Sequence, residues 1–231
     1  MILCLLYAFL HAGTPVVYEE ALSPDYTEGL DFLREHRQMF DRYLGDDSKQ
    51  KALMVSVVFP EIVRYSFVRD LLETRTLEVA YTLKGSDLVD FSIGRFQMKP
   101  SFVESLEASV KQSPRLSGKY ADILYYPKAE EALVRRTRIN RLKSLEWQLR
   151  YLRVFCDLVA AAHPFLKDQS FDYRVKFFAT AYNHSFHANK EELERWMHKK
   201  TYPYGVGIKG EQYAYSRVAL YFAQHHYSTL F

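Results

Sequence analysis

The sequence predicts a mostly α-helical fold, and three observations support this. Of its 231 residues, 48% are hydrophobic, enough to bury a sizeable core in one domain. Apolar residues recur at helical spacing in several long segments. Residues that begin or end helices stand at the borders of these segments. We therefore expect one domain over residues 13–231, preceded by a short apolar segment over residues 1–12.

That apolar segment runs from Met1 to Ala12. It is similar to the core and cleavage region of a secretory signal peptide, although the basic leading region is missing. A start site assigned downstream of the true one would explain the missing region, and a buried amino-terminal segment is the alternative interpretation. No apolar run reaches the length of about eighteen residues that a membrane-spanning helix needs, so we expect none.

The first helix is expected to begin where Asp25 and Glu28 can cap it and to run through Leu44. Gly45 is a typical helix stop. A second helix begins near Ser48 and reaches Pro60, which has no amide hydrogen to donate and is therefore expected to kink or end it.

Glu61 follows this proline, at a bend from which its side chain can face a cleft. Apolar neighbours such as Phe59, Ile62 and the more distant Phe96 would desolvate the carboxyl group and raise its pKa, as a general acid requires. The alternative is a structural ion pair between Glu61 and Arg64.

The segment from Phe91 to Ser101 mixes glycine, glutamine and small hydroxyl residues with large apolar ones, which predicts a loop. Gly94 can adopt positive φ or let a ligand approach the backbone. Gln97 offers both a hydrogen-bond donor and a hydrogen-bond acceptor to a ligand. A tight structural turn is the alternative interpretation of these residues.

Downstream of the loop, Ser101 and Glu104 form a capping-box pattern for a helix that runs to about Gln112. Residues 113–118 are expected to be a connector. A long helix is predicted over residues 128–162, and its arginine-rich stretch at 135–143 is interpreted as a solvated face. Further helices are expected over residues 171–182, from Asn189 onward, and over residues 211–227.

Charge and cysteine content limit the possible partners. A net charge of +3 is too weak to indicate nucleic acid, although it is compatible with an anionic envelope polymer. Of the two cysteines, Cys156 lies in an apolar run and is expected to be a buried, inert thiol. His184 and His187 lack acidic or cysteine partners in the sequence, so we expect no metal site and no cofactor. Eighteen tyrosines suggest that some line a groove, and a position at the boundary of the core is the alternative interpretation for each.

Three motifs follow one another in the chain. They are Glu61 after an apolar helix, Ser92-x-Gly94-x-x-Gln97-x-x-Pro100-Ser101, and Ala181-Tyr182-Asn183. This order resembles the lysozyme-like lytic transglycosylases (SLT-type domain), which cleave the glycan strands of bacterial peptidoglycan. The resemblance covers roughly residues 49–189.

The resemblance implies a lysozyme-like helical domain with an active-site groove, in which Glu61 is the single acid and base. It also implies that peptidoglycan glycan strands are the partner and that the protein lies in the periplasm or cell envelope. Such enzymes need no second carboxylate, because the substrate closes its own 1,6-anhydro ring. The implied substrate-binding residues are Ser92, which can also bond the catalytic carboxyl group, and Gly94, Gln97, Met98, Tyr182 and Asn183. Asp87 and Asp90 are interpreted as turn residues.

The chain departs from the family pattern at several positions. Ile62 follows Glu61 where the family usually has serine, and His184 stands where a glycine is common. The segment from Leu71 to Lys84 is expected to be an inserted helical segment between the first two motifs. These differences leave two alternatives: a glycan-binding or envelope assembly protein without turnover on the same fold, and a cytoplasmic helical interaction module whose motif matches are accidental.

Overall fold

The computed structural model describes residues 16–68, 74–205 and 210–231. It confirms the mostly helical prediction: the described residues form thirteen α-helices, one 3₁₀ helix and one two-stranded antiparallel sheet. Met1 to Ala12 lies outside the described residues, so the signal region stays a prediction. The lysozyme-like arrangement of these helices also stays a prediction.

One group of helices surrounds α4 (Ser48–Val68), which packs against α3 (Asp25–Leu44), α11 (Phe171–Asn183) and α13 (Tyr215–His225). The middle of α4, residues 52–63, is buried throughout and forms the centre of the core. The short helices α2 (Tyr18–Ala21) and α14 (Tyr227–Leu230) pack beside α3.

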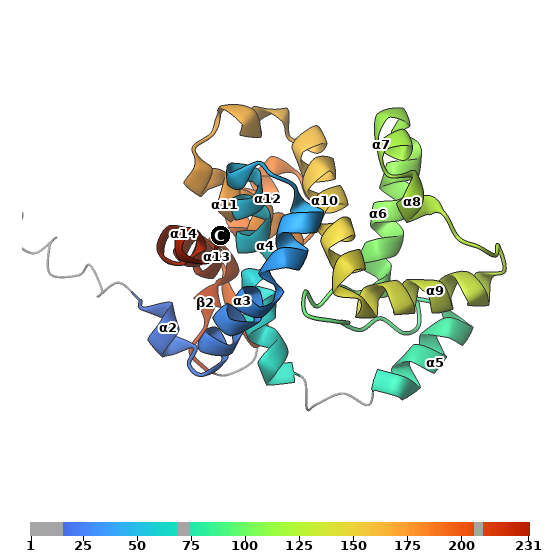
Figure 1. The fold of residues 1–231 in the computed structure, drawn as a ribbon, viewed down its shortest axis with the longest axis horizontal. Coiled ribbons are helices and arrows are strands. Elements are labelled where there is room, and N and C mark those ends of the chain that lie inside the picture. Colours follow the sequence, from blue (N-terminus) through green and yellow to red (C-terminus); the bar gives the residue numbers. More distant parts are fainter. Residues whose placement is uncertain (1–15, 69–73, 206–209) are drawn as a thin grey trace, which may run out of the picture.

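A second group contains α5 (Thr74–Lys84), α6 (Pro100–Gln112), α7 (Pro114–Lys119), α8 (Ala121–Leu124) and α9 (Glu131–Lys143). Figure 1 shows this group on the right, with α10 (Leu145–Ala162) between it and the α4 group. Helix α10 packs against both α3 and α6. The remaining elements are the 3₁₀ helix η1 (Pro164–Asp168), α12 (Lys190–Trp196), β1 (Lys200–Tyr202) and β2 (Tyr213–Ala214).

The proline in α4 does not end the helix, contrary to our prediction. Helix α4 continues through Pro60 to Val68. An interior proline costs about 3 kcal/mol, whereas each large apolar side chain that α4 buries contributes about 1.5–3 kcal/mol. The hydroxyl groups of Tyr202 and Tyr215 donate hydrogen bonds to the carbonyls of Pro60 (2.8 Å) and Val57 (2.9 Å), which ties this part of the helix to its neighbours.

The predicted start signals of two helices are also wrong. Asp25 is the first residue of α3 rather than its cap, because Pro24 takes the cap position. Helix α6 begins at Pro100, so Ser101 already lies in its first turn. Asp90 caps it instead and accepts hydrogen bonds from the amide (3.1 Å) and the hydroxyl group (2.8 Å) of Ser101.

Three further boundaries differ from the sequence prediction. The long helix over 128–162 is two helices, because the backbone becomes extended at Ser144 (ψ 125°). The connector at 113–118 is largely the helix α7, whose start is capped by Ser113. The last long helix begins at Tyr215, since Tyr213 and Ala214 pair with β1 as a strand. The predicted end of α3 at Gly45 (φ 86°) and the predicted cap of α12 at Asn189 are confirmed.

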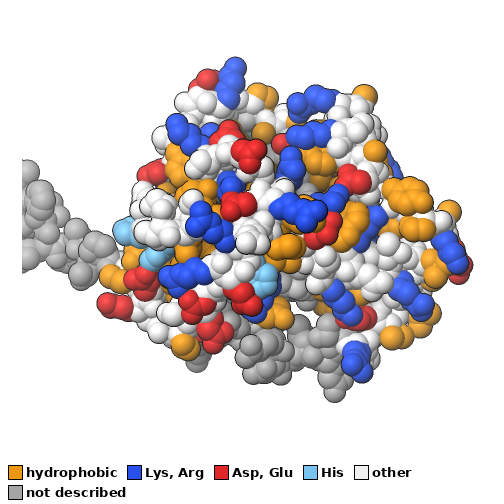
Figure 2. Space-filling model, in the orientation of Figure 1, with side chains coloured by type: hydrophobic (Ala, Val, Ile, Leu, Met, Phe, Trp, Pro, Cys, Tyr) orange, Lys and Arg blue, Asp and Glu red, His pale blue; other side chains and the backbone are white. Residues whose placement is uncertain are grey.

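The surface carries basic and acidic side chains in a mixed pattern. On the face shown in Figure 2 they alternate over most of both helix groups. Two arginines predicted to lie on a solvated face are buried instead, Arg138 and Arg141, because α9 packs against α5 and α6. Across the described ranges, none of the helices has the length and hydrophobicity needed to span a bilayer.

Candidate functional site

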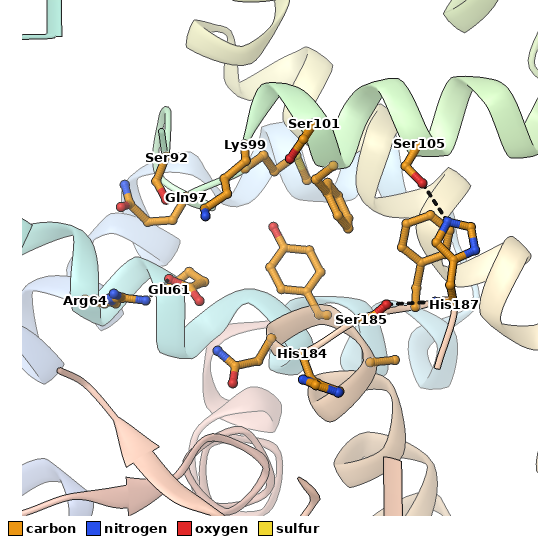
Figure 3. Close-up of a pocket in the computed structure, with 16 residues that line it drawn as sticks. Glu61, Arg64, Ser92, Gln97, Lys99, Ser101, Ser105, His184, Ser185 and His187 are labelled. Carbon is orange, nitrogen blue, oxygen red and sulfur yellow. Dashed lines mark hydrogen bonds and ion pairs between the residues drawn. The ribbon is translucent and has the colours of Figure 1, made fainter. Parts of the chain in front are cut away.

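A cavity of about 360 Å³ lies between α4, α6, the 91–101 loop and the end of α11. Six of the seven residues that the sequence assigned to a site line it: Glu61, Ser92, Gln97, Met98, Tyr182 and Asn183. In Figure 3, Glu61 faces the cavity from α4, and Ser92 and Gln97 face it from the 91–101 loop. Residues of all three motifs therefore meet at one cavity.

Glu61 is buried, with 4% of its surface exposed, yet it lines the cavity. Desolvation raises the pKa of its carboxyl group from an ordinary 4.5 to about 7, while Arg64 and the Tyr215 hydroxyl act in the opposite direction. The oxygen Oε2 has no hydrogen-bond partner among the described residues. A carboxyl group that holds its proton near neutral pH and borders a cavity is suited to general acid catalysis.

Three tyrosines surround this carboxyl group: Tyr202 and Tyr215, which are buried, and Tyr182, which is partly buried. Burial, followed by the nearby charge of Glu61, raises the pKa of all three well above its ordinary value, so they stay neutral. The Tyr215 hydroxyl group has one proton, so it can donate a hydrogen bond either to the Glu61 carboxylate or to the Val57 carbonyl. Sequence reasoning identified Tyr182 through its motif, but it did not identify Tyr202 or Tyr215.

The 91–101 loop is held as a tight turn. The backbones of Ile93 and Met98 exchange two hydrogen bonds (2.9 and 3.2 Å). Gln97 has a positive φ of 49°, and its Nε2 donates to the Gly94 carbonyl (2.9 Å). Its amide oxygen is not engaged by a hydrogen bond within the described residues. The loop is therefore a structural turn, and Gln97 can still offer its amide oxygen to a ligand in the cavity.

Gly94 is the exception among the predicted site residues, since it does not line the cavity. A Cβ at this position would lie 2.0 Å from Gln148 Nε2 and 2.7 Å from the Leu142 carbonyl, and the φ of Gly94 is +70°. Gly94 therefore packs closely against Gln148 of α10 and Leu142 of α9, and its contact with substrate stays a prediction.

Tyr182 and Ser92 differ from expectation in their bonding. The Tyr182 hydroxyl donates to the Phe96 carbonyl (2.7 Å), which connects α11 to the loop and leaves its ring as the surface next to the cavity. That ring packs edge-to-face against Phe102 and Phe155. Within the described residues, Ser92 and Glu61 form no hydrogen bond with each other, although both line the cavity.

Glu61 is the one carboxylic acid among the described lining residues. Asp90 is occupied at the start of α6, and Asp87 is exposed outside the cavity lining. His184 pairs with Glu192 (2.7 Å) and stacks on Trp196. Among residues 16–68, 74–205 and 210–231, no three His, Cys, Asp or Glu side chains are grouped closely enough to hold a metal ion.

Comparison of the chain with protein-family models, curated proteins and solved structures gives no match. The resemblance to lytic transglycosylases therefore rests on the three motifs and on the cavity that their residues share.

Proposed function

We propose that this protein cleaves the MurNAc-GlcNAc β-1,4 bond of peptidoglycan as a lytic transglycosylase, on a lysozyme-like fold. The observation that carries the proposal is Glu61, a buried carboxyl group with a pKa of about 7 at the edge of a cavity. Near neutral pH a substantial share of such groups holds a transferable proton.

In the proposed reaction, Glu61 donates its proton to the glycosidic oxygen while the bond from that oxygen to C1 breaks. The substrate's own N-acetyl group stabilises the positive charge that develops at C1. The Glu61 carboxylate then takes the proton from the substrate's 6-hydroxyl group as that oxygen bonds to C1. The products are a 1,6-anhydro ring and a free hydroxyl group on the leaving sugar, and Glu61 regains its proton.

The other lining residues support glycan binding. The free amide oxygen of Gln97 can accept a hydrogen bond from an N-acetyl N–H, and the exposed Asn183 offers a second amide. The Tyr182 and Phe102 rings add apolar surface that suits the flat faces of sugars. Because Glu61 is the single carboxylic acid of the described lining, we propose anhydro rather than hydrolytic products.

Replacement of Glu61 tests this mechanism. Glu61→Gln keeps the volume but removes the transferable proton, so glycan cleavage should fall about 100- to 10,000-fold with the fold retained. The measurement is mass spectrometry of soluble products from purified peptidoglycan, together with the melting temperature. Glu192→Gln, a partly exposed carboxyl group that pairs with His184 beside the cavity, is the matched control and should keep activity.

The nature of the released ends tests the second part of the mechanism. Muramic ends in the 1,6-anhydro form agree with the proposal. Reducing ends would instead indicate a hydrolase with a second acid, which contradicts it.

A second candidate is a glycan-binding or envelope assembly protein without turnover. It is favoured by Arg64, whose Nη1 lies 3.8 Å from Glu61 Oε2, so that Glu61 can serve as a partner in a structural ion pair. Wild-type protein that binds peptidoglycan but releases no products would support this candidate. Both candidates place the protein in the periplasm or cell envelope, and recovery of native protein from a cytosolic fraction would contradict both.

A further inference from the structure

The cavity is bridged at the end opposite Glu61. Ser105 Oγ of α6 and His187 Nε2, in the segment between α11 and α12, lie 2.6 Å apart in a hydrogen bond, and both residues line the cavity. Figure 3 shows this pair at one end and Glu61 with Arg64 at the other. The bond therefore joins the two walls of the cavity across that end.

A layer of aromatic rings supports the bridge. Phe102 of α6 and Phe186, next to His187, pack edge-to-face with their centroids 5.7 Å apart, and both line the cavity. Phe155 of α10 contacts both rings, at 6.0 and 6.2 Å. The two walls are thus held together by rings that are buried or partly buried and by the hydrogen bond at the rim.

A second cavity lies next to the first on the side of Arg64. Arg64, Asn183 and His184 also line a neighbouring cavity of about 200 Å³, which extends to Trp196 and Tyr202. A polymer that occupies the first cavity can continue in this direction, whereas the Ser105–His187 bridge stands across the other direction.

A serine next to a histidine could also be a nucleophile with its base. That chemistry needs a third group to orient the imidazole through its second nitrogen. Within the described residues, no hydrogen bond to His187 Nδ1 is formed. The pair therefore fits a bridge better than a catalytic dyad.

We propose that the Ser105–His187 bridge closes one end of the cleft, so that the site takes the terminus of a glycan strand and not its interior. This rests on the proposed function, because it presumes a glycan ligand. If one end of the cleft is closed, a glycan strand can enter the cleft only with its terminus. The number of protein molecules that one strand can bind is then limited to the number of its suitable termini.

The test uses binding by the Glu61→Gln protein, so that strands are not shortened during the assay. The probe is peptide-free peptidoglycan glycan strands, separated into a long and a short fraction and compared at equal mass. If the fractions differ about fourfold in length, the short fraction has about four times as many strand ends per unit mass. The amount of protein bound at saturation, per unit mass of glycan, should then be about fourfold higher for the short strands. In the Glu61→Gln background, Ser105→Ala combined with His187→Ala should reduce this ratio to about one. Lys111→Ala, on the exposed side of α6, is the control and should keep the ratio.

Equal binding to both fractions by Glu61→Gln would overturn the bridge proposal, and so would an unchanged ratio in the double variant. Binding to neither fraction would instead contradict the proposed function, and the bridge proposal would fail with it. The two failures are therefore distinguishable.

Discussion

Glu61 shows how a single residue couples the candidate chemistry to stability. Its pKa is about 7 in the folded chain against an ordinary value of 4.5. As the pH rises from 4.5 toward 7, the unfolded chain releases this proton while the folded chain still holds it. Ionisation therefore favours the unfolded state across this window, and the stability of the protein falls until the folded carboxyl group also ionises.

Replacement of Glu61 by Gln should remove this pH dependence. Between pH 4.5 and 8 we expect the free energy of unfolding of the wild type to fall by up to about 3 kcal/mol more than that of Glu61→Gln. Urea unfolding of both proteins at several pH values measures this difference. Parallel pH profiles would show that the folded carboxyl group is not desolvated as the structure indicates.

The sequence allowed Glu61 to be identified but not its surroundings. A lone carboxylate within an apolar helix is visible in the sequence, and so is the Tyr182-Asn183 motif. Tyr202 of β1 and Tyr215 of α13 approach Glu61 only because both bond to α4, about 140 to 160 positions away along the chain. Such a contact leaves no periodic pattern in the sequence.

At the scale of elements, the 91–101 loop was predicted as a loop, but its supports were not. The serine-glutamate pattern suggested a cap at Ser101, whereas Lys99 takes the cap position and Pro100 the first helical position, so the helix starts two residues earlier. The glutamate of that pattern, Glu104, serves elsewhere, as the acceptor for Tyr81 and Arg138. A local pattern names residues that can cap a helix, and tertiary contacts decide which of them does.

Gln148 of α10 is the main polar support of this loop. Its Oε1 accepts a hydrogen bond from the Phe96 amide, and its Nε2 donates to the Leu142 carbonyl, both at 2.8 Å. The side chain is 2% exposed. Gln148→Ala would leave two buried backbone groups unpaired, so we expect a loss of about 2–4 kcal/mol in urea unfolding.

Gln224→Ala is the control for this change. The Gln224 side chain also makes a hydrogen bond, to Asp172 (2.8 Å), but it is exposed. Its replacement should therefore alter stability by no more than about 0.5 kcal/mol. A similar effect of both substitutions would contradict the supporting role of Gln148.

At the scale of the whole molecule, the cavity depends on the position of the α5–α9 group, because α6 forms one of its walls. Arg138 of α9 holds this group together. It donates to Glu104 (3.0 Å) and Glu107 (2.8 Å) of α6 and to the Tyr81 hydroxyl (2.7 Å) of α5. Sequence reasoning placed this arginine in solvent, because a run of basic residues on a helix is usually exposed and only the packing of α5 and α6 reveals its burial.

Removal of Arg138 should loosen this group of helices selectively. Arg138→Ala leaves the buried Glu107 without its cationic partner, and breaking such a pair costs about 3–5 kcal/mol. Native-state hydrogen exchange should therefore become faster in α6 and α9 than in α4 and α13, which Arg138 does not contact. Lys143→Ala, on the same helix, breaks a more exposed pair with Glu78 and should cost less than about 1 kcal/mol. If the two variants exchange alike, or if Arg138→Ala accelerates exchange equally in both helix groups, the α6 wall is not held in place by this cluster.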